Sequence, residues 1–290
     1  MLAPTLQAEL QQFEAYLTQQ AAQLPYPEML QQAASYSLLA GGKRIRPLLA
    51  FAVAKAFGIT SATVYPLAVA IEMIHTYSLI HDDLPAMDDD ALRRGKPTNH
   101  IVYGEATAIL AGDALLTESF AQVTKLDVPS AVAVQLVAEL ARCAGGAGMV
   151  GGQILDLEAE NQQLHLEQLA NIHQLKTGRM IEIAVVGAAI IAQAQPVIIE
   201  ELRHYAQAIG LAFQIQDDIL DVTATTEQLG KPQGSDLEKE KSTYVSLLGL
   251  ERAKIALETE RQRAYQVLEN TGIATEELQA LTELICNRQA

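Results

Sequence analysis

The sequence predicts an all-α fold, and three observations lead to this prediction. Aromatic residues make up only 5% of the 290 residues and Trp is absent, whereas Ala, Leu, Gln and Glu are common. This balance favours helix over strand. Apolar residues also recur along most of the chain at the 3.6-residue spacing of amphipathic helices. No segment shows the alternating Val/Ile/Thr pattern of a half-buried strand.

Helices are expected where this spacing persists between breaks rich in proline, glycine or polar residues. Pro25-Tyr26-Pro27 ends the first helix, because proline cannot continue the hydrogen-bond ladder, and Pro47 suits the first turn of a later one. Gly95 to Asn99 and the polar stretch 223–241 are expected to be loops. The expected helices are 5–24, 28–39, 48–57, 62–81, 105–124, 129–147, 166–194, 197–223, 244–248, 251–269 and 275–287. No linker divides the chain, so we expect one domain, residues 1–290.

Charge and cysteine content exclude several classes of protein. The net charge of −15 and the pI near 4.8 argue against binding to nucleic acids or anionic membranes. Cys143 and Cys286 are too few for a disulfide framework. The first 24 residues do not resemble a secretory signal, and the longest apolar run, Ile183 to Ala192, is too short to span a bilayer. We therefore expect a cytoplasmic protein without a membrane span.

Two groups of aspartates are the most informative feature. Five aspartates and two arginines fall between His81 and Gly95. Aspartates this dense repel one another unless solvent or a multivalent cation screens them. Downstream, Asp217, Asp218 and Asp221 lie within an otherwise apolar segment, where unpaired charge is costly. Solvated helix ends are the simpler explanation, but the apolar surroundings of the second group favour one metal site built between the two.

Oxygen ligands without His or Cys indicate Mg²⁺, which usually completes its coordination shell with water and substrate phosphates. A phosphorylated substrate is therefore expected. Seven of the 20 basic residues lie next to loops or motif faces, where they could hold a diphosphate: Lys43, Arg46, Arg93, Arg94, Lys176, Lys231 and Lys241. For Arg93 and Arg94, salt bridges to the local acids are the alternative.

His75 shares a helical face with Ser78 and Asp82, at i, i+3 and i+7. A lone histidine in an apolar helix is usually a core residue, but this alignment with Asp82 makes a role in a pocket equally plausible. Gly151-Gly152-Gln153 is either a turn or a helix break, and it is not a dinucleotide fingerprint because no strand precedes it. There is no phosphate-binding loop, nucleophile elbow or Cys/His pair. Covalent catalysis is therefore unsupported, and metal-assisted chemistry on a diphosphate remains.

With these motifs the chain resembles a known family, the trans-isoprenyl diphosphate synthases. Within that family it is most similar to the bacterial farnesyl diphosphate synthases. Seven motifs in family order carry the resemblance: Gly41-Gly42-Lys43-Arg44-Ile45-Arg46-Pro47, Asp82-Asp83-Leu84-Pro85-Ala86-Met87-Asp88, Arg93-Arg94, Gly112-Asp113-Ala114-Leu115-Leu116, Gly151-Gly152-Gln153, Lys176-Thr177-Gly178 and Phe213-Gln214-Ile215-Gln216-Asp217-Asp218-Ile219-Leu220-Asp221. The resemblance implies the isoprenoid synthase fold, with about a dozen helices around a central cavity, usually as a homodimer.

The resemblance also implies a reaction and assigns residues to it. Isopentenyl diphosphate would be joined to dimethylallyl and then geranyl diphosphate by ionisation, condensation and elimination. Asp82, Asp88 and Asp217 would bind about three Mg²⁺ ions, for which Mn²⁺ can substitute, with Asp83, Asp218 and Asp221 assisting. The allylic diphosphate would be held by Arg93, Lys176 and Lys231, and isopentenyl diphosphate by Lys43, Arg46, His75 and Arg94. Thr177 and Gln214 would lie beside the developing cation, and Lys241 would help to close the site.

Product length depends on the residues just before the first aspartates. If the growing tail runs back along their helix, the residue five positions before Asp82 lies about 7 Å up the axis. That residue is Tyr77, whose ring would form a floor and limit the product to fifteen carbons. Helical geometry places Ser78 directly in line with Asp82, so Tyr77 would border the pocket from the side.

Three alternatives remain open. A geranylgeranyl diphosphate synthase shares these motifs but often has a smaller or unbranched residue at the position of Tyr77. A terpene cyclase uses one diphosphate, which would leave Lys43, Arg46 and Arg94 without a purpose. A non-catalytic subunit of a prenyltransferase typically lacks one aspartate motif, whereas this chain has both.

Overall fold

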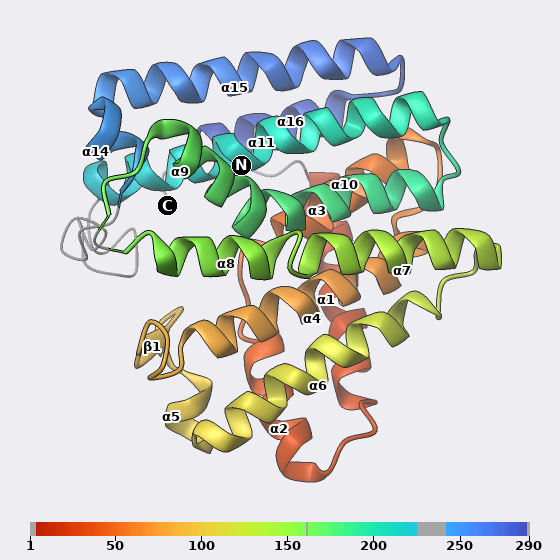
Figure 1. Cartoon of the computed structure of the whole chain (residues 1–290). Helices are drawn as coiled ribbons and strands as arrows, with labels where there is room; N and C mark the ends of the chain where they lie inside the picture. The colour runs from red at the N-terminus through yellow and green to blue at the C-terminus, as the bar shows by residue number, and fades with distance from the viewer. Residues whose placement is uncertain (1–3, 161, 225–241, 289–290) are drawn as a thin grey trace.

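Helices dominate the architecture of the computed structural model, which describes residues 4–160, 162–224 and 242–288 (Figure 1). The α-helices are α1 Pro4–Ala22, α2 Glu28–Leu38, α3 Ile45–Ala56, α4 Tyr65–Asp82, α5 Asn99–Tyr103, α6 Glu105–Val123, α7 Ser130–Ala144, α8 Met149–Glu158, α9 Leu166–His173, α10 Arg179–Ile191, α11 Pro196–Thr223, α14 Tyr244–Leu248, α15 Leu250–Thr271 and α16 Glu276–Cys286. A 3₁₀ turn, η1, covers Ser61–Val64, and a π-helical turn, η2, covers Gln174–Gly178. The prediction of an all-α fold is confirmed.

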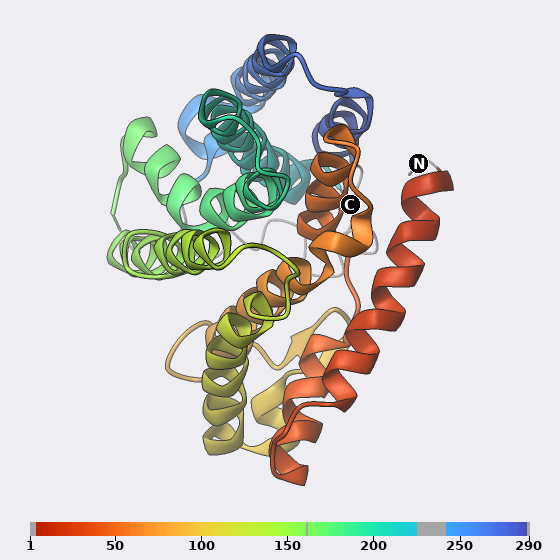
Figure 2. The same cartoon turned by 90° about the vertical axis from the view of Figure 1, so that its right-hand side faces the viewer.

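Helices α3, α4 and α10 form the centre of the bundle. α4 packs against α6 and α3, and α10 packs against α3, α7 and α11. Nearly every side chain of α10 is buried, because this helix is apolar on all sides. Figure 2 shows α1 along the outside of the bundle. These central helices fix the directions of the side chains at their ends, where the polar motifs lie.

The stretch from Ser61 to Asp82 is long and apolar enough to cross a membrane by length and composition. However, 78% of its most apolar window is buried inside the molecule. A core helix passes the same test, so this finding is weak support for a membrane span.

The prediction that Gly95 to Asn99 is a loop is wrong in part. A short hairpin pairs β1, Leu92–Arg93, with β2, Lys96–Pro97, and α5 follows at once. Arg94 and Gly95 connect the strands with φ values of 54° and 74°. Two successive positive φ values are typical of the tight turn that joins antiparallel strands. Two-residue strands are too short to produce an alternating pattern, so the sequence could not reveal them.

Two further predictions of local structure are corrected. Gly151 and Gly152 neither break a helix nor form a turn, since both lie within α8, which was not expected. The single helix expected at 166–194 is divided into α9, η2 and α10, with the π-helical turn at Lys176 and Thr177. Such turns often mark functional sites.

Candidate active site

The two aspartate groups lie at the same end of the bundle. Figure 1 shows the carboxyl ends of α4 and α11 on the same side of the bundle, that of α4 beside the β1–β2 hairpin and that of α11 beside α14. α4 ends at Asp82 and has Asp83 as its C-cap, so Pro85 follows the helix as expected for a residue that cannot continue it. Asp217, Asp218 and Asp221 lie on the last two turns of α11. The fold thus places two motifs that are far apart in the chain on the same side of the bundle.

In the first group, backbone geometry links Asp82 and Asp88. The Asp88 N–H donates to the Asp82 carbonyl at 2.9 Å, which folds the chain back after α4. Burial is the main cause that raises the pKa of Asp82 to about 6, and the nearby Asp88 adds to it, whereas Lys176 opposes it. A carboxylate in this position is stabilised by any cation that binds beside it.

Asp83 has a partner within the same group. The Arg93 Nε donates to its Oδ1 at 2.6 Å, and the Arg93 guanidinium lies 3.6 Å from an Asp90 oxygen. Arg93 is presented by β1, so the hairpin turns it back toward the aspartates. The local salt bridge considered for Arg93 is therefore present.

Lys176 is positioned by close helix packing around η2. Its Nζ lies 2.7 Å from Asp156 Oδ2 on α8. A Cβ at Gly152 of α8 would lie only 2.2 Å from the backbone nitrogen of Lys176, and a Cβ at Gly210 of α11 would lie 2.9 Å from the Cα of Gly178. Glycine at these positions lets α8 and α11 approach η2. Burial tends to lower the pKa of Lys176, but Asp156, Asp82 and Asp88 outweigh it and raise the pKa, so Lys176 is a firmly held cation.

An apolar cavity of about 400 Å³ begins at these groups. Asp82, Lys176 and Thr177 lie at its polar part, and Arg46 and His75 line it as well. The rest of the lining comes from α4, the turn after it and α8: Tyr77, Ser78, Leu79, His81, Met87, Met149, Val150, Gln153, Ile154 and Leu157. Tyr77 and Ser78 therefore both border the cavity. A polar entrance with an apolar interior suits a substrate that has a charged head and a hydrocarbon tail.

A second cavity of similar volume is lined mostly by polar and charged groups. Its cations are Lys43, Arg44, Arg46, Arg94 and Arg288, and Glu72, His75 and Asp217 lie among them. Because Arg46 and His75 also line the apolar cavity, the two cavities adjoin at these residues.

Arg46 and His75 have properties that suit an anionic ligand. Arg46 Nε is buried without a hydrogen-bond partner among the described residues. Burial first, and then the surrounding arginines, lower the pKa of His75 well below its ordinary value. The imidazole is therefore neutral near pH 7 and suited to hydrogen bonding, while the arginines supply the charge.

The cations near the start of α3 have different roles. Arg44 is buried, and its Nε lies 2.8 Å from Glu14 of α1 while its Nη1 pairs with Glu72 of α4. It ties three helices together. Arg94 instead donates from its Nη1 to the Gly41 carbonyl and covers Gly42, where a Cβ would lie 2.9 Å from the guanidinium carbon. Glycine at position 42 thus leaves space for Arg94 beside the cavity.

Arg288 is the residue that sequence reasoning missed. Its Nη2 lies 2.7 Å from Asp217 Oδ1 and also donates to the Phe213 carbonyl, at 2.7 Å. Its guanidinium lies 3.9 Å from the centre of the Phe213 ring, and the Arg288 carbonyl accepts a bond from Gln216. No motif marked Arg288, because its neighbours in the fold are some 70 residues away in the chain. Its possible signal was a lone cation near the C-terminus.

The other members of the second group are more enclosed. Asp218 Oδ2 accepts a 2.7 Å bond from the Tyr244 N–H and lies 3.8 Å from His173 Nε2, so it also anchors the start of α14. Asp221 is buried. Gln214 is partly buried on α11 and lines neither cavity. Lys231 and Lys241 lie outside the described residues, so their predicted roles stay predictions.

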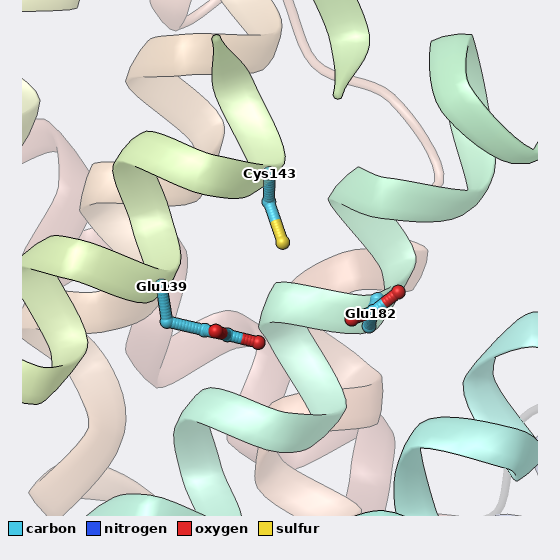
Figure 3. Close-up of side chains that lie close together, drawn as sticks. All are labelled: Glu139, Cys143 and Glu182. Atoms are coloured by element: carbon cyan, nitrogen blue, oxygen red, sulfur yellow. The ribbon is translucent and has the colours of Figure 1, made fainter. Parts of the chain in front are cut away.

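Among the residues that the structure describes, one compact group has metal-ligand chemistry, and it lies elsewhere. Glu139 and Cys143 of α7 face Glu182 of α10, with their ligand atoms within 4.8 Å of one another (Figure 3). Three arginines from α7, α10 and α11 already pair with the carboxylates: Arg142, Arg179 and Arg203. Burial raises the pKa of the Cys143 thiol to about 12, so it is protonated. With three cations against two carboxylates, this group is a buried ion-pair network and repels a divalent cation.

The aspartates at the cavities fit Mg²⁺ better. They offer oxygen ligands only, they come from two helix ends, and the carboxyl group of Asp82 is destabilised in its charged form by burial. Lysine and arginine side chains, which are suited to binding phosphate oxygens, line the same cavities.

Comparison with known proteins agrees with this arrangement. The family model described as polyprenyl synthetase matches residues 27–285. The farnesyl diphosphate synthase of Bacillus subtilis is 49% identical over 95% of this chain and 94% of its own length. Geranylgeranyl pyrophosphate synthase 3 of Arabidopsis thaliana is 50% identical over 83% of this chain and 69% of its own. The solved geranyltransferase of Helicobacter pylori, complexed with magnesium and isoprenyl diphosphate, is 35% identical, with a TM-score of 0.84 over 99% of this chain and 98% of its own.

The chain therefore belongs to the polyprenyl synthetase family. Its relatives include enzymes named for two product lengths, fifteen and twenty carbons.

Proposed function

We propose that this chain is a magnesium-dependent farnesyl diphosphate synthase, which condenses isopentenyl diphosphate with dimethylallyl and then geranyl diphosphate. The observation that carries the proposal is the pair of cavities that adjoin at Arg46 and His75. One is apolar with a charged entrance, and the other is rich in cations. Two diphosphates, one with a growing hydrocarbon tail, match this pair. The two cation sets and both aspartate groups disfavour a terpene cyclase and a non-catalytic subunit.

The proposed metal ligands are Asp82, Asp88 and Asp217, for about three Mg²⁺ ions or Mn²⁺ in their place, with Asp83, Asp218 and Asp221 assisting directly or through water. Bound Mg²⁺ supplies positive charge that stabilises the departing diphosphate as the C–O bond breaks. The H. pylori relative, solved with magnesium and isoprenyl diphosphate, supports the use of Mg²⁺.

The protein's own cations bind and orient the substrates. Lys176 holds the allylic diphosphate at the entrance of the apolar cavity, with Arg93 and Lys231. Isopentenyl diphosphate lies in the cationic cavity against Lys43, Arg46, His75 and Arg94. Its double bond is then close to the allylic carbon, and this proximity favours attack on the developing cation. Thr177, which lines the apolar cavity, lies beside that cation. Gln214 of α11 has the same role by resemblance only, since it lines neither cavity. The released diphosphate takes the proton, and Lys241 helps to exclude water.

The second candidate is a geranylgeranyl diphosphate synthase, which the 50% identity to the Arabidopsis enzyme favours. Tyr77 supports the shorter product, because its bulky ring borders the apolar cavity.

We also propose a single-domain, cytoplasmic homodimer. Exposed apolar side chains on α5 and α6 support a partner subunit there: Ile101, Val102, Ile109 and Leu110.

Product analysis tests the proposal. The purified chain is incubated with Mg²⁺, radiolabelled isopentenyl diphosphate and either dimethylallyl or geranyl diphosphate, and the products are dephosphorylated and separated by chromatography. We expect farnesol from both primers. Mainly geranylgeraniol would establish the second candidate, cyclic products from a single diphosphate would indicate a cyclase, and no product in the presence of Mg²⁺ would contradict the family of activities.

A further inference from the structure

The orientation of the Tyr77 ring is the starting point. The side chain is only 6% exposed, yet no hydrogen bond to another described residue holds its hydroxyl. Proximity to Asp82 adds to burial, and together they raise the pKa of Tyr77 to about 12, so the phenol stays neutral. A ring without a polar anchor keeps its rotamer only through packing. Whatever packs against this ring therefore fixes its position in the wall of the apolar cavity.

His81 provides that contact. It lies one helical turn beyond Tyr77 on α4, and the two ring centroids are 5.7 Å apart with an interplanar angle of 77°. This is the edge-to-face arrangement that aromatic rings favour. Both rings line the apolar cavity.

The imidazole is itself fixed from α6. His81 Nε2 lies 3.0 Å from the Ile109 carbonyl oxygen, and because a carbonyl only accepts, Nε2 carries the hydrogen and donates. The Asp113 carboxylate lies 3.9 Å from the same nitrogen. Tautomer and ring orientation are thus set by groups outside α4.

Gly112 makes room for the ring. A Cβ at this position would lie 2.2 Å from His81 Nε2 and 2.6 Å from its Cδ2. Gly112 lies within α6 and has ordinary helical backbone geometry, so glycine is needed there for space and not for conformation. Any side chain at position 112 would displace the imidazole that supports Tyr77.

We propose that His81, seated against Gly112, is a positioning residue that fixes the Tyr77 ring and thereby sets the length of the hydrocarbon product. This inference rests on the proposed prenyl diphosphate synthesis. His81 acts through Tyr77, so its role is distinct from that of the adjacent Asp82.

Two variants test this inference from opposite sides. His81→Ala removes the contact from α4, and Gly112→Ala pushes the imidazole away without changing α4. Both are expected to shift the main product from geranyl diphosphate by one five-carbon unit, from fifteen to twenty carbons, as measured by chromatography. Matched controls are His204→Ala, at a partly exposed histidine on α11, and Gly146→Ala, where an added Cβ meets nothing within 4 Å. The controls keep the fifteen-carbon product.

A double variant separates positioning from direct lining of the cavity. If His81 acts through Tyr77, then Tyr77→Ala with His81→Ala gives the same product distribution as Tyr77→Ala alone. A longer product from the double variant overturns the inference, because His81 would then bound the cavity itself. If circular dichroism shows that His81→Ala does not fold, Gly112→Ala alone and combined with Tyr77→Ala decides the question.

Failure of this inference differs from failure of the proposed function. If Tyr77→Ala lengthens the product while His81→Ala and Gly112→Ala do not, only the positioning role is lost. If the unchanged protein forms no condensation product, the proposed function fails.

Discussion

The two aspartate groups differ in where their partners come from. The first is neutralised locally, since Arg93 reaches Asp83 from only ten residues along the chain. The second has partners at long range: Arg288, near residue 290, pairs with Asp217, and the Tyr244 N–H donates a hydrogen bond to Asp218. Ion pairs between neighbours in sequence form wherever the local turn forms. The second group, in contrast, depends on the docking of the C-terminal part of the chain, so its geometry reports on the whole fold.

The largest expected effect tests whether the second group is as essential as the first. Asp217→Ala is expected to lower the Mg²⁺-dependent condensation rate by at least about 100-fold, because it removes an oxygen ligand from the site of charge development. Initial rates with labelled isopentenyl diphosphate measure this loss. Asp127→Ala, at an exposed aspartate between α6 and α7, is the control and leaves the rate unchanged. Near-normal turnover by Asp217→Ala would mean that the first group works alone.

A second prediction assigns one substrate to each group. Lys176→Gln is expected to raise KM for geranyl diphosphate, and Arg46→Gln to raise KM for isopentenyl diphosphate, each by roughly 10- to 100-fold, the value of a lost charge-assisted hydrogen bond. Steady-state kinetics with one substrate varied at a time measures both constants.

The control for these variants is Lys254→Gln, at a half-exposed lysine on α15. If both variants raised the same KM to the same extent, the two cavities would not correspond to separate substrates.

The same contrast explains what the sequence could reveal. Most helix positions followed from apolar spacing, although α5 and α8 did not. The ends of α4 and α11 were correctly placed because Pro85 and the polar stretch after Thr223 mark them locally. The pairing of Arg93 with a local acid had been weighed as the alternative to diphosphate binding, since Arg93 lies in the same stretch as Asp83. These features depend on residues a few positions apart.

Features that depend on tertiary contacts were missed. Gly152 was expected at a turn or a helix break, because glycine disfavours helix, but it lies within α8. Glycine is needed there because η2 packs so closely that any Cβ at position 152 would lie 2.2 Å from the backbone nitrogen of Lys176. Arg288 carried no motif, and the buried pairing of Glu182 with arginines of α7 and α11 could not be seen in an apolar run. In each case the deciding partner is distant in the chain.

A third prediction measures the long-range contact. Arg288→Ala is expected to lower the free energy of unfolding by about 1–2 kcal/mol in metal-free buffer, because the side chain is only 9% exposed and its guanidinium pairs with Asp217 and lies over the Phe213 ring. Urea denaturation followed by circular dichroism gives this value. Arg263→Ala, at a largely exposed arginine paired within α15, should change stability by less than about 0.5 kcal/mol. Equal effects of the two variants would show that Arg288 is only a surface ion pair.

The smallest expected effect is local opening near Arg288. Burial raises the pKa of both Cys143 and Cys286 to about 12, so at pH 8 each thiol is protonated and reacts with iodoacetamide only when its surroundings open. Cys286 lies two residues before Arg288, whereas Cys143 is remote on α7. Arg288→Ala should therefore speed labelling of Cys286 by up to roughly tenfold and leave Cys143 unchanged, as followed by mass spectrometry of peptides. An equal increase at both cysteines would indicate global unfolding, and no change at either would mean that the C-terminal segment docks without Arg288.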